Sequence, residues 1–294
     1  MERLNIQNPF GQPVYYVETC SSTMDEARRL AEEGARHGTA VMAGLQTNGR
    51  GRRETRKWTA SAGKNLTFTL ILRYPDFSHI PTAITLRSGL AAARAAADFE
   101  PALAPKIAVK WPNDVMLGDK KCAGILAESN GSVVLIGIGV NVTEDFSGAP
   151  LAGAAYEAAS IAGELALLNV KSAHDYTKAA DNIALLLEKV LDSLSYTLSP
   201  AFDGVWRQEL ERILYMKGQT VRFSPGGVTD AACRTRLVTG RLTGIDADGS
   251  ILIIPEGKTS PESFAAGELP SAGFLPCLQQ EKGHCTSKIR KLKH

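Results

Sequence analysis

Residues 49–58 place four arginines and a lysine within ten positions, separated by two glycines and ended by Trp58. Glycine permits backbone angles at which successive N–H groups converge on an anion. Arginine adds planar forks that match carboxylate and phosphate oxygens, and tryptophan offers a flat face for a purine or an apolar cover. This composition predicts a loop that binds a small anionic ligand. A solvated arginine-rich loop would explain the segment by itself equally well.

A second polar group follows a predicted strand that ends at Pro112. Asn113 and Asp114 come directly after this proline and are expected at an accessible strand edge. Lys121 opens the next strand, in which Gly124 allows another chain to approach closely. Ordinary turn chemistry would also account for this stretch.

Glycines at 137 and 139 interrupt a strand of β-branched residues that ends at Asn141. Glycine within a strand favours a bulge, tight helix packing or the close approach of a ligand. The first two interpretations need no function at all.

The elements that must position these groups alternate between strands and helices. The Ser22-Thr23 pair is followed by two acids, the pattern of a helix start, and Asn130-Gly131 is a strong hairpin turn. Alternation over 65–74 predicts a strand with one well-buried face. Together the patterns predict an α+β domain over 1–215, with strands at 14–18, 39–45, 65–74, 106–110, 121–129 and 132–140, and helices at 22–34, 82–98, 157–168, 173–195 and 200–214.

The chain changes character after this domain. Short strand patterns at 219–223, 236–245 and 250–254 occur without helices and predict a small β-barrel over 216–275. The stretch 276–294 shows no periodicity and is expected to be a basic, flexible tail.

Charge and cysteine content narrow the class of protein. The net charge is +2, but residues 46–58 alone sum to +4, which favours a small anionic ligand over DNA or RNA. No apolar run approaches the roughly 20 residues that span a bilayer, and the polar start does not resemble a signal peptide. Five cysteines lack metal spacing and are expected to be reduced thiols in a cytoplasmic protein with no membrane partner.

These motifs, taken in order over roughly residues 15 to 145, resemble those of the biotin–protein ligases. That family has a class II synthetase-like catalytic fold, the biotin–lipoate ligase fold, in which a mixed sheet is flanked by helices, and it adds a small C-terminal SH3-like barrel. The motifs are Ser22-Thr23, Gln46, Gly49-Arg50-Gly51-Arg52-Arg53 with Trp58, Lys110-Trp111-Pro112-Asn113-Asp114, Lys121-x-x-Gly124-Ile125-Leu126 and Gly137-x-Gly139-x-Asn141.

The resemblance implies a two-step ligase. Biotin's carboxylate attacks the α-phosphate of ATP to give biotinyl-5′-AMP and pyrophosphate, and a lysine of the acceptor then attacks the acyl carbon. ATP and Mg²⁺ are the expected cofactors, with Mg²⁺ held mainly through phosphates and Asn141 as the candidate protein ligand. The expected partner is a biotin carboxyl carrier protein, or the carrier domain of a biotin-dependent carboxylase.

The resemblance also implies roles for individual residues. Lys121 and Arg50 are expected to stabilise charge during catalysis, and Asp114 to accept the proton of the acceptor lysine. The residues implied to bind biotin are Ser22, Thr23, Gln46, Arg50, Gly51, Arg52 and Lys121. Those implied to bind ATP or the adenylate are Arg50, Arg52, Arg53, Trp58, Asn113, Lys121 and Asn141.

Two positions depart from the family pattern, and several alternatives remain open. Glu54-Thr55 lengthens the basic loop, and Met24 replaces a common asparagine. The nearest alternative is a lipoate–protein ligase, and the others are a non-catalytic biotin-sensing regulator and an RNA-binding protein. Only about 20 residues precede Ser22, fewer than a helix-turn-helix domain requires, so a form without an N-terminal DNA-binding domain is expected. The sequence leaves open whether the chain is a monomer or a homodimer.

Overall fold

A computed structural model describes residues 1–53, 57–146, 157–172, 174–226 and 237–269 of the 294-residue chain. The expected basic tail, 276–294, and the unusual pair Glu54-Thr55 lie outside the described residues.

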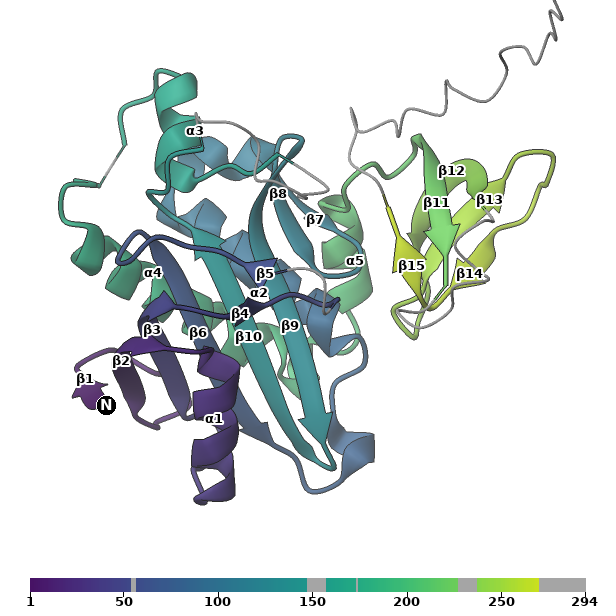
Figure 1. The fold of residues 1–294 in the computed structure, drawn as a ribbon. Helices are drawn as coiled ribbons and strands as arrows, with labels where there is room; N and C mark the ends of the chain where they lie inside the picture. The colour runs from purple at the N-terminus through teal and green to yellow at the C-terminus, as the bar shows by residue number, and fades with distance from the viewer. Residues whose placement is uncertain (54–56, 147–156, 173, 227–236, 270–294) are drawn as a thin grey trace, which may run out of the picture.

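An eight-stranded mixed sheet forms the centre of the larger unit (Figure 1). Its order is β1-β2-β3-β6-β10-β9-β8-β7, with β2 and β3 parallel and the other neighbours antiparallel. The expected mixed sheet flanked by helices is therefore confirmed. The strands are β1 (Glu2–Leu4), β2 (Val14–Cys20), β3 (Ala40–Gln46), β6 (Asn65–Arg73), β7 (Ile107–Lys110), β8 (Asp114–Leu117), β9 (Lys120–Asn130) and β10 (Val133–Asn141).

Helices cover both faces of this sheet. Helix α1 (Thr23–Glu32) contacts β3, β6 and β10, while α2 (Ile84–Phe99) packs with α4 (Ala179–Thr197) on the other face (Figure 1). The expectation of one buried face on strand 65–74 was therefore wrong, since Thr67 and Thr69 are also buried. Alternation of apolar and hydroxyl side chains indicated a solvent-facing side, but α1 and its surroundings cover it.

The helix boundaries follow local capping. Ser22 caps α1 by accepting a hydrogen bond from the Met24 N–H, as predicted, and Gly34 adopts φ +92° just beyond the helix. Helix α4 begins later than expected because Asp175 accepts hydrogen bonds from the Thr177 N–H and hydroxyl and forms a turn. The expected helix over 157–168 is shorter, α3 (Ile161–Leu167), and that over 200–214 divides into η3 (Pro200–Phe202) and α5 (Trp206–Arg212).

Arg87 ties the helical layer together from inside. Its side chain is 1% exposed and donates to the Thr197 carbonyl at 2.6 Å, the Ser199 carbonyl at 3.0 Å and Asp203 at 2.6 Å. A buried guanidinium is tolerated because each contact gives it an acceptor. It thereby fixes α2 to the end of α4.

The C-terminal part forms a five-stranded antiparallel sheet of order β14-β13-β12-β11-β15. In the part of the chain that the structure describes, β14 and β15 are not paired with each other, so a closed barrel is not observed. Its strands are β11 (Thr220–Pro225), β12 (Val238–Ile245), β13 (Ile251–Pro255), β14 (Glu262–Phe264) and β15 (Gly267–Glu268).

This smaller sheet shares a hydrophobic core with the larger unit. Trp111 Nε1 donates to the Gly249 carbonyl at 3.0 Å, and its ring lies edge-on to Phe223 with centroids 5.8 Å apart. Val221, Phe223 and Leu242 belong to the same buried cluster as Trp111. The smaller sheet is therefore packed against the larger unit through the turn between β7 and β8. None of the helices described here is long and apolar enough to cross a membrane.

Candidate functional site

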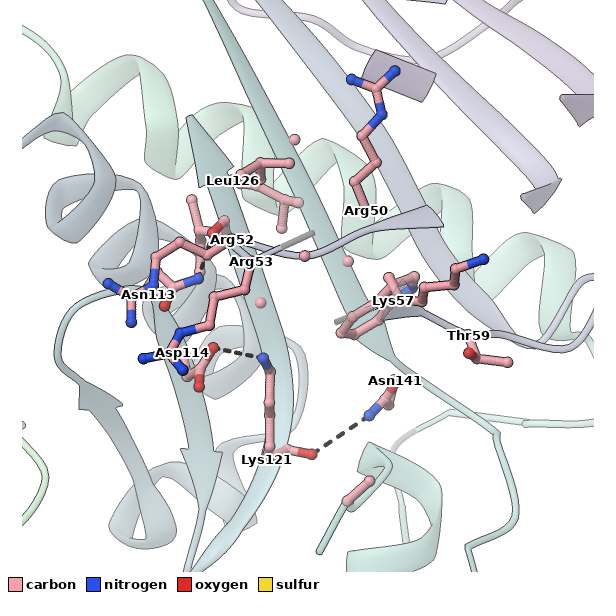
Figure 2. A pocket seen from close by; sticks show the side chains of 18 of the residues that line it. Arg50, Arg52, Arg53, Lys57, Thr59, Asn113, Asp114, Lys121, Leu126 and Asn141 are labelled. Atoms are coloured by element: carbon pink, nitrogen blue, oxygen red, sulfur yellow. Dashed lines mark hydrogen bonds and ion pairs between the residues drawn. The ribbon is translucent and has the colours of Figure 1, made fainter. Parts of the chain in front are cut away.

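A cavity of about 500 Å³ lies over the β8–β10 side of the large sheet. Its walls come from the start of α1, the basic segment and the last described residues, Glu268 and Leu269. Figure 2 shows part of this cavity from close by, and Gly49 and Lys110 of the quoted motifs do not line it. All of the residues to which the resemblance assigned a role do line it. They are Ser22, Thr23, Gln46, Arg50, Gly51, Arg52, Arg53, Trp58, Asn113, Asp114, Lys121 and Asn141.

The basic segment enters the cavity as a short hairpin of β4 (Gly49–Arg50) and β5 (Lys57–Trp58). The Trp58 ring lies against β10, where a Cβ added at Gly139 would come within 2.5 Å of the ring. A Cβ at Gly137 would instead meet Met24 Sδ at 2.8 Å. Tight helix packing thus explains Gly137, whereas Gly139 provides space for the tryptophan.

Lys121 and Asp114 form an ion pair at the cavity wall, with 2.6 Å between Nζ and Oδ1 (Figure 2). They project from neighbouring strands on either side of a bulge in the β8–β9 pairing. A bulge bends a strand and redirects side chains, which brings these two together. The lysine side chain is 25% exposed and the aspartate 7%. The pair therefore places a partly accessible ammonium group over a buried carboxylate.

Arg50, Arg52 and Arg53 of the basic hairpin all pair with acids, Arg50 on one side of the cavity and the other two with a shared glutamate. Arg50 pairs with Asp25 on α1 and lies 3.6 Å from Glu128, pointing away from Lys121 (Figure 2). Arg52 donates to the Gly267 carbonyl at 3.0 Å, and both Arg52 and Arg53 pair with Glu268, at 3.3 and 3.0 Å. These acids offset the mutual repulsion of the arginines. The β15 strand thus contributes a carboxylate directly to the cavity.

A buried polar network forms another part of the wall. The Thr23 N–H and hydroxyl donate to Gln46 Oε1 at 2.7 and 3.1 Å, and the Thr69 hydroxyl donates to Thr23 Oγ1 at 2.8 Å. Fully bonded buried networks are rigid and specify orientation. Thr69 was missed in the sequence because the alternation of its strand indicated an exposed side.

Two asparagines hold the backbone around Lys121. Asn113 Nδ2 donates to the Ile125 carbonyl at 2.8 Å. Asn141 Nδ2 donates to the Ala159 carbonyl at 3.1 Å and to the Lys121 carbonyl at 3.4 Å. Both amides therefore fix the cavity wall as well as line it.

Thiol chemistry does not fit the cysteines near the cavity. Burial raises the pKa of Cys20 to about 11, and burial together with the Glu164 charge raises that of Cys122 to about 12. Both remain protonated near neutral pH, and both are free thiols, as expected. Cys233, Cys277 and Cys285 lie outside the described residues.

Several cavity residues carry no signal that sequence reasoning could have used. They come from distant segments and have no motif of their own: Phe146, Glu157, Ala158, Glu268 and Leu269. The described residues contain no group of three or more His, Cys, Asp or Glu side chains placed to hold a metal ion.

The sequence was compared with family models and with curated proteins. Residues 16–145 match the sequence model of the Biotin/lipoate A/B protein ligase family. The chain is 40% identical over 140 residues to the bifunctional ligase/repressor BirA of Bacillus spizizenii, covering 46% of this chain and 42% of BirA. It is 42% identical over 138 residues to the biotin–[acetyl-CoA-carboxylase] ligase of Paracoccus denitrificans, covering 45% of this chain and 54% of that protein. The chain thus spans about half the length of these curated relatives.

The similarity to a solved structure extends further along the chain. A biotin protein ligase from Aquifex aeolicus, solved in complex with biotin, superposes with a TM-score of 0.66 at 25% identity. The match covers 88% of this chain and 98% of the other chain. At this coverage the superposition extends into the smaller C-terminal sheet of this chain.

Proposed function

We propose that this protein is an ATP-dependent biotin–protein ligase that forms biotinyl-5′-AMP and transfers the biotinyl group to a lysine of a biotin carboxyl carrier domain. The observation that carries the proposal is the arrangement around one cavity of Lys121, three arginines and Trp58. Cations and an aromatic cover suit a reaction that gathers negative charge beside a purine.

The first step joins a carboxylate oxygen of biotin to the α-phosphorus and breaks the bond to the pyrophosphate oxygen. Lys121 stabilises the charge on the carboxylate and α-phosphate, and Arg50 and Arg52 bind the carboxylate or phosphates. Ser22, Thr23 and Gln46 bind the ureido ring of biotin, with Gly51 allowing the backbone to approach. Their buried network favours a ligand that satisfies its polar groups.

Arg53, Trp58, Asn113 and Asn141 bind the nucleotide. Trp58 Nε1 is buried and has no hydrogen-bond acceptor among the described residues, so a bound adenylate can supply one. Mg²⁺ supplies Lewis-acid neutralisation of the phosphates when bound. Asn141 is the residue proposed to hold it, because the two hydrogen bonds that its Nδ2 donates leave Oδ1 as the ligating atom.

In the second step the amine of the acceptor lysine attacks the acyl carbon and AMP leaves. Asp114 is proposed to accept the amine proton. It is paired with Lys121 in this structure, so the role requires Lys121 to turn toward the adenylate phosphate and release the carboxylate.

We also propose a domain division, a cellular location and a partner for the protein. Residues 1–215 form the catalytic domain and 216–275 an SH3-like barrel, supported by the five-strand order and the bulge between Leu242 and Gly244. Free buried thiols support a cytoplasmic location. The protein acts on a carrier domain without binding DNA, and it works either alone or as a homodimer.

One experiment tests the function directly. The protein is incubated with biotin, ATP, Mg²⁺ and a biotin carboxyl carrier domain, and the acceptor is weighed by mass spectrometry. A gain of one biotinyl group supports the proposal, and the same gain with lipoate in place of biotin would favour a lipoate ligase. If neither pyrophosphate nor acylated acceptor forms, the ligase is excluded. Biotin binding without either product would indicate the non-catalytic biotin-sensing regulator.

A further inference from the structure

Glu144 lies just beyond the end of β10 and receives three hydrogen bonds from the segment that follows Trp58. Its Oε2 accepts from the Ser61 N–H at 2.8 Å and from Asn65 Nδ2 at 2.7 Å, and its Oε1 accepts from the Ser61 hydroxyl at 2.7 Å. Asn65 in turn accepts a hydrogen bond from the Val142 N–H at 3.1 Å. One carboxylate thus joins the entrance of β6 to the exit of β10.

Backbone hydrogen bonds extend the same junction. The Thr143 N–H donates to the Lys64 carbonyl at 2.9 Å, and the Gly63 N–H donates to the Gly44 carbonyl at 3.1 Å. On its other side, the Glu144 carbonyl accepts from the Ser160 hydroxyl at 2.7 Å. Residues 59–64 and 157–160 therefore meet at Glu144, and both segments border the cavity.

The basic hairpin depends on anchors of this kind. Among its described residues, the two strands pair through Gly49 with Trp58 and Arg50 with Lys57. So short a ribbon is marginal by itself in water. Its first end is fixed where the Thr47 and Asn48 N–H groups donate to the Cys20 and Ser21 carbonyls, at 2.9 Å each. The second end runs three residues from Trp58 to Ser61, where Glu144 holds it.

We propose that Glu144 is a positioning residue, which anchors the returning end of the basic hairpin so that Trp58 and the arginines are ordered over the cavity before the nucleotide binds. The inference rests on the proposed function for its activity readout. It assigns Glu144 no contact with substrate. Losing the anchor should weaken nucleotide binding, because the segment must then be ordered at the moment of binding.

A Glu144→Gln variant can distinguish the effect of the hydrogen bonds of Glu144 from the effect of its negative charge. Burial would raise the pKa of Glu144, but hydrogen bonds from Ser61 and Asn65 and the nearby Lys64 outweigh it and lower the pKa, so the group is ionised at neutral pH. A glutamine at this position retains all three contacts. Its Oε1 accepts from the Ser61 N–H and Asn65, and its Nε2 donates to the Ser61 hydroxyl, which can accept.

The test compares Glu144→Ala, Glu144→Gln and Ser61→Ala in biotin-dependent pyrophosphate release. Glu144→Ala should raise KM for ATP about tenfold with kcat within about twofold, Ser61→Ala should raise KM about threefold, and Glu144→Gln should match the wild type. Asp76→Ala is the matched control and should change neither constant. Asp76 likewise accepts from the N–H and hydroxyl of one serine, Ser78, but it lies outside the cavity.

The inference is overturned if Glu144→Ala leaves KM for ATP unchanged, or if its kcat falls by as large a factor as its KM rises. It is also overturned if Glu144→Gln is as impaired as Glu144→Ala. If Glu144→Ala does not fold, Ser61→Ala and Glu144→Gln still carry the comparison. If the wild-type protein releases no pyrophosphate, the proposed function fails instead. The anchor is then tested by calorimetric titration of the same variants with ATP, where a wild-type Kd in Glu144→Ala would exclude it.

Discussion

Lys121 Nζ lies 2.6 Å from Asp114 Oδ1, across a strand bulge and at the wall of the cavity. The Asp114 carboxylate is nearly buried, and the Lys121 ammonium group is the cation that pairs with it. Removing one member of such a pair leaves the other exposed to the full cost of desolvation. Variants at either position must therefore be judged for folding as well as for catalysis.

Lys121→Met should reduce biotin-dependent pyrophosphate release by about a hundredfold or more, because a cation at the reacting centre is lost. Stopped assays of pyrophosphate give the rate, and thermal unfolding reports how much of the loss is structural. Lys120→Met is the control, since Lys120 is adjacent but pairs at the surface with Glu157 at 3.6 Å. Near-normal release by Lys121→Met would remove Lys121 from the mechanism.

Asp114→Asn should separate the two half-reactions. If Asp114 accepts the acceptor's proton, biotinyl-adenylate forms and is retained while transfer slows. That defect should shrink as pH rises toward the ordinary lysine pKa of about 10.4, because the amine then loses its proton unaided. Single-turnover transfer from preformed adenylate measures it. An equal, pH-independent loss in both steps would leave Asp114 as a partner that only orients Lys121.

Gly139→Ala should weaken nucleotide binding by about tenfold, since the added methyl group would lie 2.5 Å from the Trp58 ring and displace it. Titration calorimetry with ATP gives the change in Kd. Gly204→Ala, where no atom lies within 4 Å of the added carbon, should bind as the wild type does. Unchanged affinity in Gly139→Ala would mean that the ring position does not matter for the nucleotide.

Arg87→Met should lower the free energy of unfolding by about 2–4 kcal/mol, because the buried Thr197 carbonyl and the partly buried Ser199 carbonyl lose their donor. Urea unfolding measures this loss, and biotin affinity of the folded variant should stay the same. Arg94→Met is the control. Arg94 lies over the Tyr196 ring at 5.3 Å, a contact worth about 1 kcal/mol. Equal losses in both variants would contradict the structural role of Arg87.

Local patterns in the sequence predicted the elements around the cavity, whereas the cavity residues were predicted through the resemblance of the ordered motifs to a known family. Ser22 caps a helix, Lys121 opens a strand and Asn130-Gly131 turns a hairpin, and each is determined by a few neighbouring residues. Glu268 pairs with Arg52 and Arg53 although these residues are far apart in the chain. Arg52 and Glu268, for example, are separated by 216 positions. No local pattern encodes such a contact. The burial of Thr69 was missed for the same reason, since it depends on a helix formed elsewhere.

The placement of Glu268 and Leu269 in the cavity wall also sets an order in time. A ribosome adds roughly 5–20 residues per second, so these two positions follow Thr23 by tens of seconds. Thr23, Gln46 and Thr69, which form the polar network, are all synthesised well before β15, whose Glu268 pairs with the arginines. The residues proposed to bind the biotin ring are therefore made long before the pairing of Arg52 and Arg53 with Glu268 can form. If the protein is the ligase proposed above, this order would keep the reactive mixed anhydride out of an unfinished site, because the arginines meet Glu268 only when the C-terminal sheet is in place.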